Sequence, residues 1–170
     1  MQFRKWMSVL LIVGMVLGQG LSAFAAGDMP DVWESDGART TYIAKESAND
    51  EIQALLVLVN RERQQAGLPA LRLDSTLTAV AEKRAEEIVE RFSHIRPNGK
   101  KWYTISCLVY GENLAQGLNR ASTVMDAWMN STGHKTNILS PFTTMGLARV
   151  RSGGTTYWVQ LFGYGTPRAE

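Results

Sequence analysis

The chain has very little cysteine and histidine, and this limits the chemistry it can carry. Cys107 is the single cysteine, so no internal disulfide can form and the fold must be stabilised by packing. Cys107 lies in the apolar run ISCLVY without a base or positive charge beside it, so we expect a small buried side chain rather than a nucleophile. Any imidazole chemistry depends on the two histidines, His94 and His134.

The chain also has no net charge once the two basic residues at its start are left out of the count. Of 18 lysine and arginine residues, Arg4 and Lys5 lie at the start, which leaves 18 − 2 = 16 basic residues against 16 acidic ones. The remaining sequence has no stripe of lysine and arginine interleaved with aromatic residues, which a nucleic-acid surface requires. We therefore expect no nucleic-acid partner.

A long apolar run occurs at the start of the chain. It extends from Trp6 to Leu17, follows two basic residues and precedes small residues that end in Ala23-Phe24-Ala25. This pattern predicts a secretory signal peptide, residues 1–26, cleaved after Ala25 or Ala26. The alternative is a retained membrane anchor, but glycines interrupt the run and it is short for a bilayer. We expect no transmembrane segment after cleavage, and a protein that is secreted or associated with the cell envelope.

The remaining length suits one domain, for which we expect the range 47–165 after a flexible lead-in at 27–46. Ser47 and Asp50 form a capping-box pattern before an amphipathic helix that Gly67 ends. A second helix follows the N-cap Asp74. One of its faces is apolar, and the other carries a stripe of glutamates that we interpret as solvent-exposed side chains rather than catalytic acids. The apolar face of this helix is Leu77, Val80, Ala81, Ala85, Ile88 and Phe92, and the stripe is Glu82, Glu86 and Glu90.

The second half of the chain combines helix and strand patterns. A turn at Pro97 to Gly99 places His94 on the last turn of the second helix or just beyond it. A third helix is expected from Ser122 to Met129, ended by Gly133, with His134 directly after it. Two strand patterns, Met145 to Val150 and Thr155 to Phe162, flank Gly153-Gly154 and predict a hairpin. Helices first and paired strands last indicate an α+β fold.

His94, Glu112 and His134 each lie at a glycine or turn boundary, whereas a core histidine usually lies in an apolar stripe. Two imidazoles and one carboxylate are ligand types that hold zinc, and they can equally serve as base, acid and electrostatic support. No two of the three share a helix face, as the histidines of HExxH do. The spacing alone therefore leaves both roles open.

Several short motifs follow one another along the chain: FSHIRPNG, GENLAQG, WMNSTGHKTNIL with MGLARV, and YWVQLFG. In this order they resemble the CAP superfamily, also called SCP or pathogenesis-related-1-like domains. The earlier stretch NRERQQAGLPALRLDSTLTAVAEKRA is similar to the start of the bacterial branch. The resemblance covers about Asn49 to Gly163. It implies an α-β-α sandwich with a central antiparallel sheet and a cleft lined by two histidines and two acidic residues.

The resemblance also assigns residues to that cleft, which binds a divalent metal in some eukaryotic members. By motif, the two histidines correspond to His94 and His134, candidate ligands of zinc or another divalent cation. The glutamate corresponds to Glu112, a candidate catalytic residue. The second acid, three residues after the tryptophan of the third helix, is replaced here by Ser131, counted from Trp128. A serine cannot supply the missing negative charge, so a mechanism that uses four such residues is in doubt.

Other motif residues have simpler interpretations. Asn113 and Asn137 lie beside the site residues, where their amides either line the cleft or tie loop backbone. Trp128 and Trp158 are at positions that favour core packing. Arg96 is by default an exposed loop arginine, and the alternative is that it faces the cleft and binds an anion.

Three functions remain open at this point. The sequence favours a binding module whose cleft holds a small ligand, such as a lipid, a peptide or a wall fragment, with or without a divalent metal. The second function is a metal-dependent hydrolase or peptidase, in which His94 and His134 hold the cation and Glu112 activates water. The third is a structural extracellular protein in which the histidines organise loops.

Overall fold

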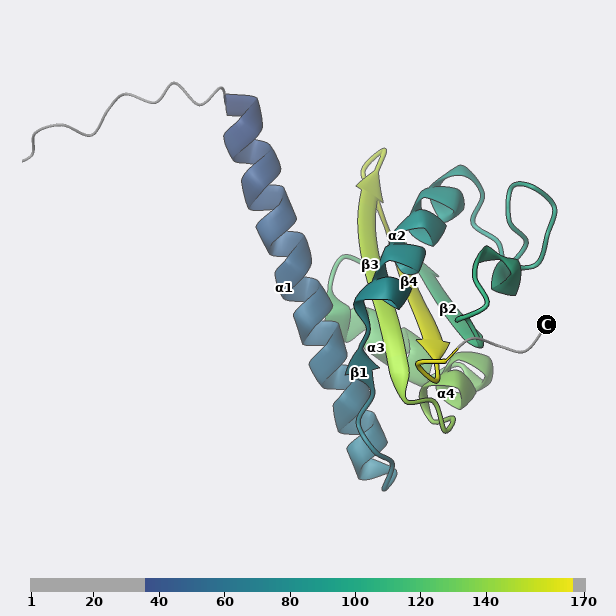
Figure 1. The fold of residues 1–170 in the computed structure, drawn as a ribbon. Helices are drawn as coiled ribbons and strands as arrows, with labels where there is room; N and C mark the ends of the chain where they lie inside the picture. Colours follow the sequence, from purple (N-terminus) through teal and green to yellow (C-terminus); the bar gives the residue numbers. More distant parts are fainter. Residues whose placement is uncertain (1–35, 167–170) are drawn as a thin grey trace, which may run out of the picture. The chain divides into compact units, whose positions relative to one another are not determined.

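The computed structural model describes residues 36–166, and the side chains of residues 48–166. The predicted signal peptide and the first part of the predicted lead-in lie outside these residues. The described elements, in chain order, are α1 (Asp36–Gln65), β1 (Arg72–Leu73), α2 (Ser75–Glu90), the 3₁₀ helix η1 (Trp102–Ile105), β2 (Gly111–Gln116), α3 (Ala121–Met129), α4 (Thr132–Ile138), β3 (Thr144–Ser152) and β4 (Thr155–Gly163) (Figure 1).

Helix α1 begins at Asp36, well before the predicted start, so the Ser47 pattern lies inside the helix and does not cap it. The stretch 38–66 contains neither glycine nor proline, so nothing in it interrupts a helix. The predicted lead-in is therefore helical from Asp36 onward. Gly67 ends the helix as predicted: its φ is +71°, and Leu68 N–H donates to Arg63 O in a Schellman motif. Across residues 36–166, no helix is long and apolar enough to cross a membrane.

Helix α2 follows its predicted pattern closely. The Asp74 side chain accepts a hydrogen bond from Leu77 N–H at 2.9 Å and caps the helix. Four of the predicted apolar residues are buried, and the predicted glutamate stripe is exposed. The prediction for Phe92 was wrong, because this side chain is 45% exposed. The backbone of Arg91 is extended, which ends the helix and takes Phe92 out of the helical register.

The sheet is mixed, with the strand order β1-β3-β4-β2. The predicted hairpin is confirmed: β3 and β4 pair antiparallel from Thr144↔Gly163 to Ser152↔Thr155, and Gly153 and Gly154 both have positive φ. Such values suit the two-residue turns that match the twist of paired strands. Strand β2 also pairs antiparallel with β4, whereas the short β1 pairs parallel with β3. The expected antiparallel sheet therefore has one parallel pair at its edge.

Helices cover both faces of the sheet, which confirms the α-β-α sandwich. Helix α2 packs Leu77, Ala81 and Ile88 against Val159 and Leu161 on one face. Helices α1, α3 and α4 pack on the other face, around the buried rings of Trp128 and Trp158. Both tryptophans lie in the core as predicted, and their Nε1–H groups donate to the carbonyls of Leu114 and Leu118.

Two local predictions were wrong for reasons visible in the backbone. Gly133 does not end the third helix: α3 ends at Met129, and Gly133 lies in the next helix, α4. The break between the two helices occurs at the extended residue Ser131, and φ of Gly133 is not positive. Cys107 is exposed rather than buried, because ISCLVY runs from η1 into a turn and does not form a strand.

Candidate functional site

A cleft of about 490 Å³ lies beside β2, the edge strand opposite to β1. Four parts of the chain line it: the segment after α2, the 3₁₀ helix η1, strand β2, and helix α4 with its N-cap. The structure thus brings the predicted residues His94, Glu112, Ser131 and His134 together around one space. The complete lining is His94, Trp102, Glu112, Ser131, Gly133, His134 and Asn137.

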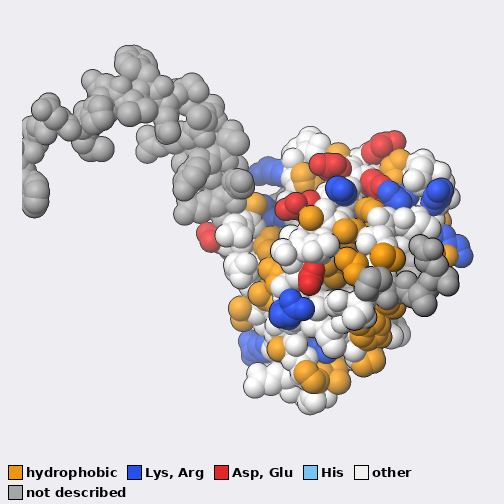
Figure 2. All heavy atoms as spheres, in the orientation of Figure 1, with side chains coloured by type: hydrophobic (Ala, Val, Ile, Leu, Met, Phe, Trp, Pro, Cys, Tyr) orange, Lys and Arg blue, Asp and Glu red, His pale blue; other side chains and the backbone are white. Residues whose placement is uncertain are grey.

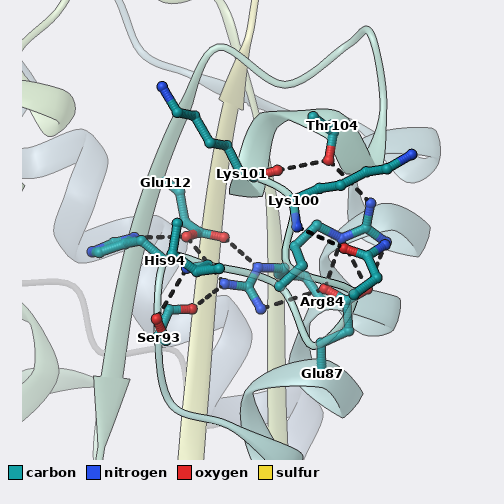
Figure 3. A network of polar contacts seen from close by, with 11 residues as sticks. Arg84, Glu87, Ser93, His94, Lys100, Lys101, Thr104 and Glu112 are labelled. Atoms are coloured by element: carbon teal, nitrogen blue, oxygen red, sulfur yellow. Dashed lines mark hydrogen bonds and ion pairs between the residues drawn. The ribbon is translucent and has the colours of Figure 1, made fainter.

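Glu112 lies at the centre of a buried polar network. Its side chain shares the sheet face of Leu114, which α2 covers, because side chains alternate along a strand. Arg84 Nε of α2 donates to Glu112 Oε2 at 2.7 Å, and His94 Nδ1 lies 2.7 Å from Glu112 Oε1 (Figure 3). The Arg84 and Glu112 side chains are 0% and 1% exposed. Both carboxylate oxygens are therefore occupied, and the buried negative charge is neutralised by an arginine.

Arg84 is the residue that the sequence analysis missed. It lies on the buried face of α2, among Ala81, Ala85 and Ile88. An arginine in an apolar stripe is itself a signal, because a buried guanidinium needs hydrogen-bond acceptors, carboxylate or carbonyl, from elsewhere in the fold. Arg84 Nη2 also donates to the carbonyl of Ser93, which fixes the backbone just before His94. Arg84 therefore both neutralises Glu112 and holds the loop that carries His94.

Arg96 belongs to the outer part of the same network. Its guanidinium donates to both oxygens of Glu87, with a shortest distance of 2.6 Å, and Glu87 in turn pairs with Arg84 at 3.4 Å. The hydrogen bond to Glu87 raises the pKa of Arg96. Arg96 does not line the cleft and its side chain is only 16% exposed, so neither the anion-binding interpretation nor that of an exposed loop arginine holds.

The contact with Glu112 defines the state of His94. An ionised carboxylate only accepts hydrogen bonds, so His94 Nδ1 must carry a hydrogen and donate the hydrogen bond to Glu112 Oε1. In the neutral ring, Nε2 is then an acceptor, and the side chain is 54% exposed. A carboxylate that accepts from Nδ1–H in this way fixes the tautomer and the orientation of the ring. Nε2 is therefore the hydrogen-bond acceptor that His94 offers to the cleft.

His134 has a different environment. It lies on α4 and is half-buried, with its ring tilted against Trp128 at a centroid distance of 6.3 Å. Burial lowers the pKa of His134, and the nearby charge of His94 lowers it further. Its Nδ1 is buried and has no hydrogen-bond partner in the described part of the chain. His134 is therefore neutral at neutral pH and retains unused hydrogen-bonding capacity.

The two asparagines join β2 to α4 beneath the histidines. Asn137 Nδ2 donates to Glu112 O at 3.1 Å and to Asn113 Oδ1 at 2.9 Å. Asn113 Nδ2 donates to His134 O at 3.2 Å and to Gln160 Oε1 at 3.1 Å. Asn113 is fully buried and lies behind the cleft, whereas Asn137 is among its lining residues. Both side-chain amides therefore donate hydrogen bonds to backbone carbonyls. The segments that they join are strand β2 and helix α4 rather than loops.

The donors that face the cleft do not form a closed zinc site. Ser131 is the N-cap of α4 and makes no capping hydrogen bond, so the position of the second acid offers a neutral hydroxyl. Zinc in proteins is usually held by three or four nitrogen, sulfur or carboxylate ligands, and the oxygens of Glu112 are already engaged. Among residues 36–166, no group of three or more His, Cys, Asp or Glu side chains is arranged to hold a metal ion. The side chains around the cleft therefore do not fit a zinc ion.

Comparisons with known proteins agree with this fold. The model of the cysteine-rich secretory protein family, CAP, matches residues 56–162. The uncharacterized protein YkwD of Bacillus subtilis (strain 168) is 35% identical over 137 residues, which cover 75% of this chain and 52% of YkwD. An extracellular protein with an SCP domain from Bacillus anthracis str. Ames is 26% identical, with a TM-score of 0.60 over 72% of this chain and 41% of that one. An outer surface protein of Borrelia burgdorferi is 24% identical, with a TM-score of 0.61 over 67% of this chain and 92% of that one.

The chain belongs to the CAP family, and its similarity to bacterial proteins confirms the bacterial CAP/SCP-like domain that the motifs indicate. It spans about half the length of the curated relative it matches. The relative from Bacillus anthracis is described as extracellular.

Proposed function

We propose that this chain is an exported binding module whose cleft holds a hydrophilic peptide or wall fragment, without a metal ion and without bond cleavage. One observation supports this proposal above all others: both oxygens of Glu112 are engaged, one by Arg84 and one by His94. A carboxylate in this state is a poor cation ligand and a poor base for water. It acts instead as the group that orients His94.

The lining of the cleft favours a polar ligand over a lipid. His94 Nε2 is available to accept a hydrogen bond from an N–H or O–H group of the ligand, and the Ser131 hydroxyl makes no capping bond. Trp102 is the single large apolar side chain of the lining, and its half-buried ring offers a flat surface to a sugar or an aliphatic stem. A fatty acyl chain would need a longer apolar wall than one indole supplies.

Export is part of the proposal. It is supported by the signal-peptide pattern of residues 1–26 and by the description of the Bacillus anthracis relative as extracellular. A wall fragment or a peptide is a ligand that an exported domain would meet.

The hydrogen bond between His94 and Glu112 favours one second candidate, a hydrolase. In this version His94 Nε2 removes a proton from water, and Glu112 stabilises the imidazolium that forms. The base is then His94, whereas the sequence analysis gave this role to Glu112. The cleft lining contains one hydroxyl, Ser131, and no thiol, so a covalent intermediate would depend on Ser131.

Calorimetric titration of soluble disaccharide-peptides, released from cell wall by a muramidase, tests the proposal directly. The buffer contains a chelator, and the same fragments are titrated into His94→Ala and into Glu90→Gln, a control on α2 outside the cleft lining. We expect saturable binding by the wild type and the control, weakened about tenfold in His94→Ala, the loss of about one hydrogen bond. Binding that is equal in all three proteins would contradict the role of the cleft.

Chromatography of the same mixtures separates binding from turnover. Unchanged fragments after prolonged incubation are the expected result. Products that form with the wild type but not with His94→Ala would replace the binding module by the hydrolase. Absence of binding by any fragment, together with a lower melting temperature of His94→Ala, would leave the histidines as structural groups.

A further inference from the structure

The two histidines reach the cleft from different segments of the chain. We call this space of about 490 Å³, which His94, Glu112 and His134 line together, the histidine cleft. His94 follows α2, and its carbonyl accepts a hydrogen bond from Trp102 N–H of η1 at 3.1 Å. His134 lies on α4, and its carbonyl accepts from Asn113 Nδ2 of β2 at 3.2 Å. The backbones of both histidines are therefore fixed at separate borders of one cleft.

His94 offers a hydrogen-bond acceptor to this space. Its Nδ1 lies 2.7 Å from Glu112 Oε1, which keeps the hydrogen on Nδ1 and leaves the lone pair on Nε2 (Figure 3). Within residues 48–166, His94 Nε2 has no hydrogen-bond partner, and the side chain is 54% exposed. A ligand must therefore bring an N–H or O–H group to this nitrogen.

His134 offers the opposite group, a hydrogen-bond donor. Its Nδ1 is buried and lacks a partner among the described residues. Buried N–H groups without an acceptor are rare in proteins and unpaired acceptors somewhat less so, which favours the lone pair on Nδ1. In the neutral ring the hydrogen then lies on Nε2. This nitrogen is not among the buried unpartnered atoms and makes no hydrogen bond within the described chain, so it is accessible from the cleft that His134 lines.

Both rings are held in place by neighbouring side chains. The ring of His134 lies against Trp128, with the centroids 6.3 Å apart and the planes tilted by 49°. Trp128 is itself fixed, because its Nε1–H donates to Leu114 O at 3.1 Å. The ring of His94 is held by Glu112. The acceptor and the donor are therefore in position before a ligand arrives, which reduces the entropy lost on binding.

We propose that the histidine cleft recognises an uncharged secondary amide in its trans form. The N–H group of the amide donates to His94 Nε2, and the C=O group accepts from His134 Nε2–H. This inference rests on the proposed function, because it names the chemical group by which the binding module holds its ligand. A peptide bond and the N-acetyl group of a wall sugar both supply this pair of hydrogen-bonding groups.

An amide matches the two nitrogens better than other polar groups do. A carboxylate only accepts hydrogen bonds and would leave His94 Nε2 without a donor, whereas an ammonium only donates and would leave His134 Nε2–H without an acceptor. A hydroxyl can do both, but through one oxygen that both rings would have to reach. In a trans amide the N–H and C=O groups point in opposite directions, which suits partners at separate borders of a cleft.

The charges of the protein also favour a neutral group. Figure 2 shows acidic and basic side chains interspersed on the visible face rather than gathered by sign. At the cleft, the charge of Glu112 is neutralised by Arg84, and Ser131 brings no charge. Short-range hydrogen bonds therefore decide which ligand binds, rather than attraction between opposite charges.

Nitrogen NMR of the full-length ¹⁵N-labelled protein, without a ligand, tests the two tautomers. At about pH 8 an ordinary histidine is neutral, and the ¹⁵N shifts of each ring show which nitrogen carries the hydrogen. We expect the hydrogen on Nδ1 in His94 and on Nε2 in His134. A lone pair on Nε2 in both rings would overturn the proposal. This result does not depend on whether the protein is a binding module.

Two small probes test the preference for an amide. In acetyl-lactate methyl ester, an oxygen replaces the N–H group of acetyl-alanine methyl ester. Each is titrated into the wild type while the signals of both imidazoles are followed, and we expect the amide to bind about tenfold more tightly. Equal binding, or no shift of either ring up to the solubility of the probes, would contradict amide recognition. If wall fragments still bound in calorimetry, the binding module would stand and the amide preference alone would fall.

Two leucine variants assign the contacts, with Glu90→Gln as the control outside the cleft lining. In His94→Leu the preference for the amide over the ester should disappear, because the N–H group has lost its partner. In His134→Leu both probes should bind about tenfold more weakly and the preference should remain, because both carry the C=O group. A preference lost in His134→Leu instead would overturn the assignment. The probe comparison in the wild type stays decisive if a variant does not fold.

Methyl N-acetylglucosaminide, a sugar with one N-acetyl group, distinguishes the two sources of the amide. Tighter binding of this sugar than of acetyl-alanine methyl ester identifies an N-acetyl group as the recognised amide, and the reverse order identifies a peptide bond. Either order supports the proposal. Binding of both compounds that is unchanged in His94→Leu and in His134→Leu would contradict it.

Discussion

Arg84→Met removes the partner of a carboxylate that has almost no access to water. The Arg84 and Glu112 side chains are 0% and 1% exposed, and their shortest distance is 2.7 Å. Removal of one member of such a pair costs ~3–5 kcal/mol, because the remaining charge stays buried without compensation. Loss of the Arg84 hydrogen bond to Ser93 O adds about 1 kcal/mol. Since a domain of this size is stable by roughly 5–15 kcal/mol, we expect a folded but much weakened protein.

Urea unfolding at neutral pH measures this cost, and a second variant identifies its cause. In Arg84→Met with Glu112→Leu, both charges are absent, so most of the lost stability should return. A cost below about 1 kcal/mol for Arg84→Met, typical of a surface pair, would refute the buried ion pair.

Three further predictions concern other parts of the chain. The pKa of His134 in the folded protein is lowered from its ordinary value of 6.5, so the unfolded chain binds the proton first as the pH falls. The free energy of unfolding should therefore decrease as the pH drops below about 6.5. Urea midpoints measured against pH should show this decrease, and His134→Gln should make it smaller. Gly146→Ala should cost about 3 kcal/mol in urea unfolding, because its Cβ would lie 2.3 Å from the backbone of α2, whereas Gly133→Ala, with open space around it, should change stability by less than about 1 kcal/mol. N-terminal sequencing of exported protein should show cleavage after Ala25 or Ala26, and an intact leader would contradict the signal-peptide prediction.

The parts of the fold that were predicted from sequence depend on local patterns. Asp74 caps α2, Gly67 ends α1 and the pair Gly153-Gly154 turns the hairpin, and each of these outcomes depends on residues that are close in sequence. The parts that were missed depend on what the chain meets elsewhere. A glycine is a weak stop signal where its φ stays negative, as at Gly133, and the apolar run around Cys107 forms a turn after η1.

The candidate site, too, was predicted in one part from the sequence and missed in another. The family motifs assigned His94, Glu112 and His134 to one cleft, and the structure places all three around it. Their chemical state could not be predicted, because it depends on Arg84, which is 28 residues from Glu112 in sequence. The position of Arg84 in the apolar stripe of α2 indicates that it needs a partner, but does not show which carboxylate it meets.

Calorimetric titration of zinc into the metal-free protein, beside His134→Ala, tests the central claim most directly. That claim is that Glu112 is engaged by Arg84 and His94, so the cleft binds its ligand without a metal ion. We expect no binding near one equivalent in either protein, because two imidazoles and a hydroxyl form an incomplete zinc site. Binding near one equivalent in the wild type that is lost in His134→Ala would contradict it.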